Sequence, residues 1–248
     1  MIAGGPYATL FALLHGGMHH GSSWDLVAAQ LRARGHHVVT PDLPVDDAAA
    51  GAREWAQCAI DAIDAAVTNC GDAHVALVAH SIAGLCAPVV AANRSLRRMI
   101  FVAGLIPVPG GTFAAHLAQN PGAITFPATL SADGGPFGLT WESVREGFYH
   151  DCPEPLARSA FDGLREQAFT IFTERCPVER WPDVPSSYIL MTDDRAISRD
   201  WAQRIASDTA RARIHTMPGG HSPFFARPKE LCDLLIACCD DGERHGGG

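Results

Sequence analysis

Short apolar runs alternate along the chain with longer segments in which apolar residues recur about every 3.6 positions. The short runs are rich in Val, Ile, Leu and Phe and too short for helices, so they predict β-strands at residues 9–14, 37–40, 74–79, 99–103, 187–191 and 213–217. The periodic segments predict helices at residues 23–34, 52–68, 83–93, 198–208 and 228–239. This alternation predicts an α/β fold with a roughly six-stranded, mostly parallel sheet flanked by helices.

One region, residues 105–185, interrupts the alternation. It holds about half of the prolines and most of the aromatic residues, and roughly 80 residues are too many for an ordinary connection between a strand and a helix. Ligands in open α/β sheets bind at the carboxyl ends of the strands. We therefore expect a largely helical cap inserted over those ends, with residues 1–104 and 186–248 forming the core. A small second domain without a role at the site is the alternative.

A serine follows the third predicted strand in a setting of small residues. Ser81 has Ala79 two positions before it and Ala83 two positions after it, with Gly84 next. A strand–nucleophile–helix turn, the nucleophile elbow, needs small residues at those two positions because the turn is tight. Ser81 is therefore a candidate nucleophile, although an ordinary N-cap serine fits this stretch equally well when it is read alone.

Two glycines follow the first predicted strand. Gly16 and Gly17 allow a sharp turn that leaves backbone N–H groups free to point into a pocket. Acyl transfer needs such donors for the developing oxyanion. In an elbow arrangement one donor is the amide directly after the nucleophile, here Ile82, and the other comes from this early loop. We assign the second donor to Gly17; a plain Gly-Gly turn is the alternative.

A candidate acid and a candidate base follow Ser81 in the chain order that the elbow requires, Ser, then Asp, then His. Of the 12 histidines, His221 stands in a glycine loop directly after the last predicted strand, at the carboxyl end of the sheet. Asp193 and Asp194 follow the fifth strand, and either one could orient the imidazole. We prefer Asp194. Because all three residue types end strands in the right order, they predict a Ser–His–Asp triad.

Composition and charge limit the classes of molecule that we expect the protein to bind. The chain has 248 residues and a net charge of −8, which argues against nucleic acid or an anionic membrane as the main partner. The partner that we expect is a small-molecule substrate. The eight cysteines form no C-x-x-C pair, so no metal site is indicated. Residues 1–7 do not resemble a signal peptide, and no apolar run reaches the roughly 20 residues of a membrane helix. We expect free thiols and a cytoplasmic location.

The chain resembles the α/β-hydrolase superfamily, and within it the branch that contains hydroxynitrile lyases and plant methyl-ester esterases. The 148–153 and 220–223 strings are similar to those of bacterial members. The resemblance implies an α/β-hydrolase fold and a triad that needs no cofactor, with the aspartate before Arg195, Asp194, as the acid. It runs nearly end to end, through residues 15–17, 20–21, 24, 35–36, 41–44, 80–81, 101–103, 148–153, 192–197 and 220–223.

Two positions beside the candidate site distinguish the hydroxynitrile lyases of that branch from its esterases. Its Hevea-type hydroxynitrile lyases carry a threonine directly after the first histidine and a lysine directly after the catalytic one. This chain has Gly16 and Ser222 there, and Gly16 matches the esterase pattern. For the remaining histidines near the site we expect structural roles, with His20 packed under the oxyanion loop and His150 in the cap near the pocket.

These observations predict a serine hydrolase for a small to medium apolar carboxylic ester. Ser81 attacks, His221 transfers the proton, Asp194 fixes the imidazole tautomer, and the amides of Gly17 and Ile82 stabilise the oxyanion. One alternative is a non-hydrolytic lyase, cyclase or isomerase of natural-product metabolism that uses the same site. Another is a non-catalytic small-molecule binder. The substrate and the oligomeric state stay open, with a homodimer as one option.

Overall fold

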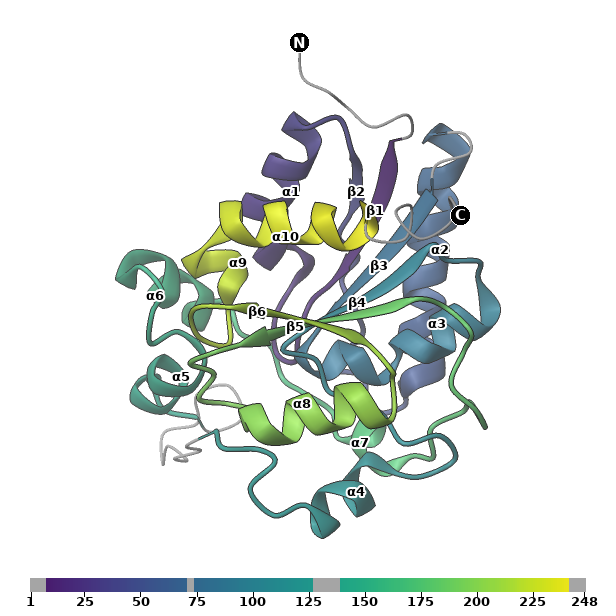
Figure 1. Ribbon diagram of the computed structural model, residues 1–248. Coiled ribbons are helices and arrows are strands. Elements are labelled where there is room, and N and C mark those ends of the chain that lie inside the picture. Colours follow the sequence, from purple (N-terminus) through teal and green to yellow (C-terminus); the bar gives the residue numbers. More distant parts are fainter. Residues whose placement is uncertain (1–7, 71–73, 127–138, 241–248) are drawn as a thin grey trace.

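Six parallel strands form one sheet in the order β2-β1-β3-β4-β5-β6 (Figure 1). The computed structural model describes residues 8–70, 74–126 and 139–240. The α/β prediction is confirmed, and each expected strand is found within one residue of its expected ends. The strands are β1 (Thr9–Leu14), β2 (His37–Val39), β3 (His74–His80), β4 (Arg98–Val102), β5 (Ser186–Met191) and β6 (Arg213–Met217).

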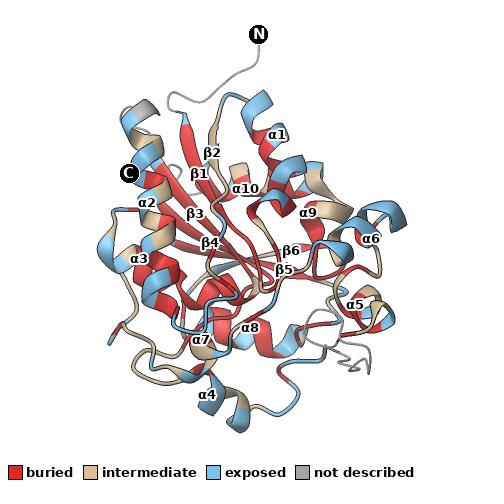
Figure 2. Ribbon diagram, turned by 180° about the vertical axis from the view of Figure 1, so that it is seen from behind, coloured by how far each residue is buried: buried red, intermediate tan, exposed pale blue. Residues whose placement is uncertain are grey.

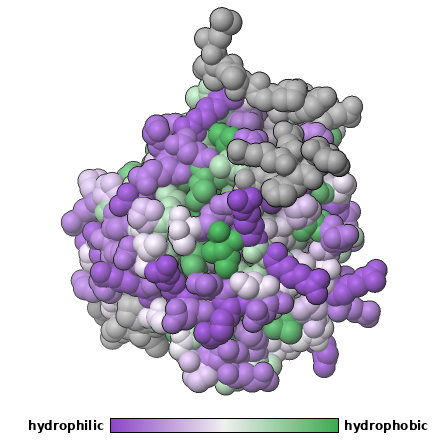
Figure 3. All heavy atoms as spheres, viewed as in Figure 1, coloured by the Kyte–Doolittle hydropathy of each residue, from purple (hydrophilic) through white to green (hydrophobic). Residues whose placement is uncertain are grey.

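The inner strands are buried on both faces, as Figure 2 shows for the centre of the molecule. A strand covered on both faces can be apolar at every position, which is why these segments read as continuous apolar runs. The edge strands β2 and β6 are only partly buried. The outer surface seen in Figure 3 is mainly hydrophilic, with apolar residues in separate small patches.

Helices cover both faces of the sheet (Figure 1). Alternate residues of β1 point to opposite faces: Phe11 packs in one core with α1 and α10, and Leu10 packs in the other with α2 and α8. The first layer contains α1 (Asp25–Ala33), α9 (Pro223–Ala226) and α10 (Pro228–Asp240). The second contains α2 (Ala52–Cys70), α3 (Ala87–Asn93) and α8 (Arg199–Asp208).

Two predicted helices begin differently from expectation. The helix expected at residues 83–93 starts as a 3₁₀ turn, η2 (Ser81–Leu85), and becomes α-helical only in α3. Pro88 lies in the first turn of α3, where its missing N–H costs nothing, so the α-helix starts there. The helix expected at 23–34 likewise starts with a 3₁₀ turn, η1 (Gly21–Trp24), and ends at Ala33. The short α9 was not predicted.

The connection between β4 and β5 spans residues 103–185, of which 127–138 lie outside the described residues. Its described part contains α4 (Phe113–Gln119), α5 (Trp141–Phe148), α6 (Glu154–Asp162) and α7 (Thr170–Thr173). Helix α4 contacts α7, and α5 contacts α6 (Figure 1). A separate apolar cluster joins α5 and α6 to Met18, which follows β1. This connection therefore packs directly against the loop that carries Gly16 and Gly17.

The cysteine side chains and the hydropathy of the helices relate to two further expectations, free thiols and the lack of a membrane helix. The seven cysteines whose side chains are described are free thiols, all of them buried or half-buried. Among the helices of the described ranges, none combines the length and apolar character needed to cross a bilayer. Residues 1–7, on which the expected location partly rests, lie outside the described part.

The register of the sheet brings four loops together at its carboxyl edge. Leu14 at the end of β1 pairs with Ala79 in β3, so the loops after these neighbouring strands leave the sheet side by side. Met191 at the end of β5 pairs with Met217 at the end of β6. The loop with the candidate acid and the loop with the candidate base therefore also leave the sheet side by side. All four loops begin where parallel strands end, so the candidate residues that they carry lie in one region.

Candidate active site

Ser81 is the first residue of η2, at a strained turn directly after β3. Its φ is +51°, in the left-handed region that non-glycine residues rarely adopt. The turn is fixed by the Leu105 amide, which donates to the Ser81 carbonyl at 2.8 Å. Ala79 and Ala83 are buried, and a Cβ on Gly84 would collide with the carbonyl of Leu105. The small residues around Ser81 therefore follow from close packing, as expected for a nucleophile elbow.

Ser81, His221 and Asp194 form one line of hydrogen bonds. His221 Nε2 lies 3.0 Å from Ser81 Oγ, and His221 Nδ1 lies 2.9 Å from Asp194 Oδ2. A carboxylate only accepts, so Nδ1 carries the proton and Nε2 is left to accept from the serine hydroxyl. The side chains of His221 and Asp194 are 2% and 5% exposed, so water hardly competes for these bonds.

The two adjacent aspartates have different surroundings. Besides His221, Asp194 accepts backbone hydrogen bonds from Ala196 at 2.8 Å and Ile197 at 3.0 Å, which fix its carboxylate. Asp193 is exposed and accepts from the Thr192 hydroxyl at 2.8 Å, a bond that lowers the pKa of Asp193. The structure thus places Asp194 against the imidazole and turns Asp193 away from it.

A second buried histidine, His80, holds the backbone of His221 in place. His80, directly before the serine, donates from Nε2 to the backbone carbonyl of His221 at 2.9 Å. Burial holds the pKa of His80 well below its usual value, so the ring is neutral. The ring of Phe148 stacks on His221 from another side, with centroids 5.3 Å apart. The imidazole is therefore held by its backbone and by ring packing as well as by Asp194.

Gly16 and Gly17 lie where there is no space for side chains. A Cβ on Gly16 would come within 2.6 Å of His80 Nδ1, and one on Gly17 within 2.8 Å of Gln167 Oε1. Gly17 and Ile82, the two predicted oxyanion donors, line the same cavity as the nucleophile. The sequence did not point to Gln167, which lies in the long connection and far away along the chain.

The expectation for His20 is wrong. The histidine under the oxyanion loop is His19, which is buried and donates from Nδ1 to the Gly17 carbonyl at 2.6 Å. The side chain of His20 is 41% exposed, and it bonds the carbonyl of Gly163 at 3.0 Å. His150 lies beside the acid loop, where it donates to the Asp193 carbonyl at 3.0 Å, and it does not line the cavity within the described chain. Two adjacent histidines cannot be distinguished by sequence when the preceding turn is irregular.

The cavity beside Ser81 is small and apolar. Its volume is about 180 Å³, and among the described residues no Asp, Glu, Lys or Arg lines it. Ile124, which lines it, is 40% exposed. The apolar lining includes Leu105, Ile124, Phe126, Phe148, Phe172 and Ile197. Over the described ranges, no cluster of three or more His, Cys, Asp or Glu side chains is arranged to bind a metal ion.

Comparison with known proteins identifies the family. The model of the alpha/beta hydrolase family matches residues 11–234. The chain belongs to this family. Methylesterase 7 of Arabidopsis thaliana is 26% identical over 260 residues, covering 93% of this chain and 96% of the relative. A pyrethroid hydrolase of Sphingobium wenxiniae is 24% identical over 247 residues, covering 92% and 86%.

Solved structures support the same fold for this alpha/beta hydrolase. The crystal structure of a pyrethroid hydrolase from Sphingobium faniae superposes with a TM-score of 0.72 at 18% identity, covering 96% of this chain and 100% of the other. Polyneuridine aldehyde esterase superposes with a TM-score of 0.73 at 17% identity, covering 93% and 98%. At these identities the likeness establishes the fold and leaves the substrate to the site itself.

Proposed function

We propose that this protein is a serine esterase that hydrolyses small to medium, apolar carboxylic esters. The observation that carries the proposal is the buried line from Ser81 through His221 to Asp194, with contacts of 3.0 and 2.9 Å. A nucleophile, a base with its free nitrogen facing that nucleophile, and an acid that fixes the tautomer are the parts acyl transfer needs. The names of the relatives, methylesterase and pyrethroid hydrolase, agree with ester hydrolysis.

In the first half of the reaction, Ser81 Oγ attacks the carbonyl carbon while His221 Nε2 takes the hydroxyl proton. Asp194 stabilises the imidazolium that forms. The tetrahedral oxyanion is bound by the amides of Gly17 and Ile82. Each such donor contributes roughly 3–4 kcal/mol to lowering the barrier in serine hydrolases. His221 then gives its proton to the departing alkoxide, which leaves as the alcohol, and the acyl group stays on Ser81.

In the second half, water replaces the alcohol. His221 takes a proton from a water molecule that attacks the acyl carbonyl, and the same two amides bind the second oxyanion. Collapse of this intermediate breaks the bond to Ser81 Oγ, which recovers its proton from His221. The free carboxylic acid leaves, and the site returns to its starting state without a metal or an organic cofactor.

The cavity supports the choice of an apolar substrate. Phe126, Phe148 and Phe172 come from the connection between β4 and β5, which we propose serves as a cap over the sheet edge. No charged carboxylate or ammonium side chain of the described chain faces the cavity, so a charged acyl group would lose its hydration without finding a partner. The cavity of about 180 Å³ limits the acyl group to modest size.

The surroundings of Gly16 favour hydrolysis over cyanohydrin cleavage. A side chain at this position would meet His80 Nδ1 at 2.6 Å and Ser81 Cβ at 3.2 Å. The threonine that the Hevea-type lyases carry at the matching place does not fit here unless His80 moves. Ser222, which follows the base, has no ammonium group to stabilise a leaving cyanide. The site therefore lacks both groups on which that lyase chemistry depends.

A panel of p-nitrophenyl esters tests the proposal. The purified protein is expected to hydrolyse the acetate and butyrate and to discriminate against the negatively charged succinate monoester. Ser81→Ala should abolish turnover, and the control Ser22→Ala, which alters an exposed serine, should retain it. Turnover at the wild-type rate by Ser81→Ala would contradict the proposal. A wild-type protein that binds the esters but returns them unchanged would indicate a binder instead.

A further inference from the structure

Five consecutive residues, from the last residue of α5 to the turn before α6, contact three of the four loops of the proposed site, those after β1, β5 and β6. The 148–152 segment lies in the long connection, and its sequence string is part of the resemblance noted above. Each member reaches a different partner: Phe148 stacks on the ring of His221, Tyr149 binds His19, His150 binds the Asp193 carbonyl, Asp151 accepts from the Gly220 amide and Cys152 donates to the Ser222 carbonyl. Because five consecutive residues all contact the loops of the site, we expect them to act together on its geometry.

On the oxyanion side, one peptide group is held at both ends. His19 Nδ1 donates to the Gly17 carbonyl at 2.6 Å, and the Met18 amide, the other end of the same peptide, donates to Gln167 Oε1 at 3.2 Å. The Tyr149 hydroxyl lies 2.7 Å from His19 Nε2. Since Nδ1 carries the proton, Nε2 must accept from Tyr149. Burial lowers the pKa of His19 to about 4 and raises that of Tyr149, so both groups stay neutral.

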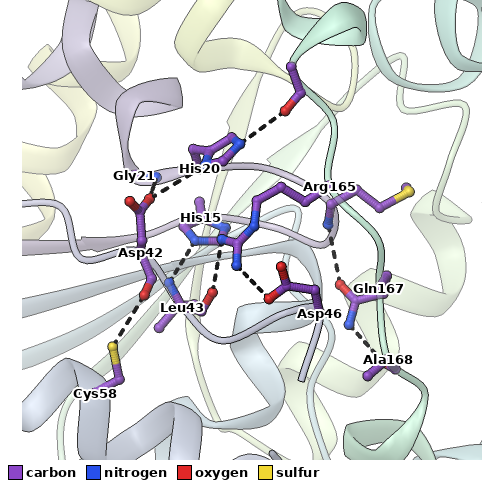
Figure 4. A network of polar contacts seen from close by, with 12 residues as sticks. His15, His20, Gly21, Asp42, Leu43, Asp46, Cys58, Arg165, Gln167 and Ala168 are labelled. Carbon is purple, nitrogen blue, oxygen red and sulfur yellow. Dashed lines mark hydrogen bonds and ion pairs between the residues drawn. The ribbon is translucent and has the colours of Figure 1, made fainter. Parts of the chain in front are cut away.

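The preceding peptide contains the proposed oxyanion donor. Its carbonyl, on Gly16, accepts from His15 Nδ1 at 2.8 Å, and its N–H belongs to Gly17. In a trans peptide these groups point in opposite directions, so His15 orients the Gly17 N–H from behind. The Leu43 amide in turn donates to His15 Nε2 at 2.9 Å (Figure 4). Because the peptide of the donor and the peptide that follows it are both held, the direction of the Gly17 N–H is fixed by the side chains around it.

The connection also holds this loop by its own backbone. The Arg165 amide donates to the Met18 carbonyl at 2.7 Å, which complements the bond from the Met18 amide to Gln167. Arg165 and Gln167 lie on the same stretch of the connection, and a dashed line joins the Arg165 guanidinium to Asp46 (Figure 4). These two groups are 2.6 Å apart. Met18 has a φ of +63°, a conformation that needs such support.

On the acid–base side, the same segment binds the backbone of two loops. His150 Nε2 donates to the Asp193 carbonyl at 3.0 Å, beside the acid. Asp151 Oδ2 accepts from the Gly220 amide at 2.9 Å, directly before His221. Neither His150 nor Asp151 touches Ser81 or lines the cavity within the described chain. Their contacts can therefore affect the reaction only through the loops that they hold.

We infer that the 148–152 segment is a positioning element in which Tyr149 aligns the oxyanion loop through His19 and Asp151 aligns the loop of His221. The inference rests on the proposed function, since it assigns these residues to the geometry of acyl transfer. Tyr149 holds the ring of His19 in place by donating to Nε2. Without the hydroxyl, the buried Nε2 has no partner, and the ring loses one of the two hydrogen bonds that fix it against the Gly17 carbonyl. The Gly17 N–H then loses its fixed direction.

Tyr149→Phe tests the oxyanion branch. We expect kcat to fall about tenfold or more with KM changed less than about twofold, because the lost alignment matters only in the transition state. Binding of a trifluoromethyl ketone, which forms a tetrahedral adduct with the serine, should weaken by the same factor as kcat/KM. The control Tyr188→Phe removes another fully buried hydroxyl, bonded to the Gly104 carbonyl at 3.0 Å, and should leave the ketone affinity near that of wild type.

Asp151→Ala tests the other branch at a partly exposed position, with Asp162→Ala, an exposed carboxylate at the end of α6, as its control. We expect Asp151→Ala to slow fluorophosphonate labelling of Ser81 about fivefold or more and Asp162→Ala to leave it unchanged. Wild-type kcat and ketone affinity in Tyr149→Phe, or wild-type labelling in Asp151→Ala, would overturn the inference. Neither result would affect the proposed function, which is tested separately by ester hydrolysis and labelling of Ser81 in the wild type and by the loss of both in Ser81→Ala.

Discussion

At the scale of single residues, the carboxylate of Asp194 is fixed by three groups. It faces His221 with one oxygen and accepts two backbone hydrogen bonds with the other. Asp193, one position earlier, is exposed and bonds its neighbour Thr192. The two adjacent aspartates therefore have different environments: Asp194 faces the imidazole, and Asp193 faces water.

This contrast gives a matched pair of variants. Asp194→Asn should lower kcat roughly 10³–10⁴-fold, because an amide in place of the carboxylate favours the wrong imidazole tautomer and no longer stabilises the imidazolium. Asp193→Asn should leave kcat within about twofold of wild type. Steady-state hydrolysis of p-nitrophenyl butyrate measures both. The assignment is refuted if the two variants exchange their effects.

At the scale of elements, the fold and the close approach of Ser81, His221 and Asp194 could be predicted because few arrangements satisfy the pattern. Continuous apolar runs indicate strands buried on both faces, and parallel strands bring their carboxyl ends to one edge. A serine after β3, an aspartate after β5 and a histidine after β6 must then meet there. The assigned Asp194, preferred over its neighbour, is the one that faces His221.

What could not be predicted depends on packing between distant segments. Tyr149 and Gln167 lie more than a hundred residues from the loop that they hold, and nothing in the spacing of the connection fixes its register against that loop. The sequence does not distinguish His19 from His20, because the direction of each side chain depends on the left-handed conformation of Met18. Such conformations are set by tertiary contacts and leave no mark in a single sequence.

The elbow itself makes a prediction about stability. Gly84→Ala should lower the free energy of unfolding by about 1–3 kcal/mol, because the added methyl group meets the backbone carbonyl of Leu105, which cannot rotate away. Gly111→Ala is the control, since its Cβ would make an ordinary 3.5 Å contact with the Val108 carbonyl. Chemical denaturation of the three proteins measures the difference. Equal stability of both variants would show that the elbow tolerates a larger residue.

At the scale of the whole molecule, the site is built around neutral, buried histidines. Burial lowers the pKa of His15 and of His19 from 6.5 to about 4, and it lowers that of His80 in the same direction. Each ring donates from one nitrogen to a backbone carbonyl, and the neutral rings of His15 and His19 accept a hydrogen bond at the other nitrogen. In the unfolded chain these histidines regain their ordinary pKa values and bind protons more readily.

Stability should therefore fall as the pH decreases from about 6.5 to about 4. In that window the unfolded chain binds more protons than the folded protein, so acid favours unfolding, by up to about 3 kcal/mol for each of His15 and His19. His19→Gln should flatten the slope of the unfolding free energy against pH by up to about 1.4 kcal/mol per pH unit. Denaturant titrations at several pH values measure this slope, and an equal slope in both proteins would contradict the role given to burial.

The central claim is that Ser81 carries the acyl group during ester hydrolysis. Its most direct test is rapid acid quenching of the enzyme with p-nitrophenyl trimethylacetate, followed by mass spectrometry of the peptides. The account predicts a burst of about one p-nitrophenol per active site and a trimethylacetyl group on the peptide that contains Ser81, with neither in Ser81→Ala. An acyl group found on another residue, or continued hydrolysis by Ser81→Ala, would contradict it.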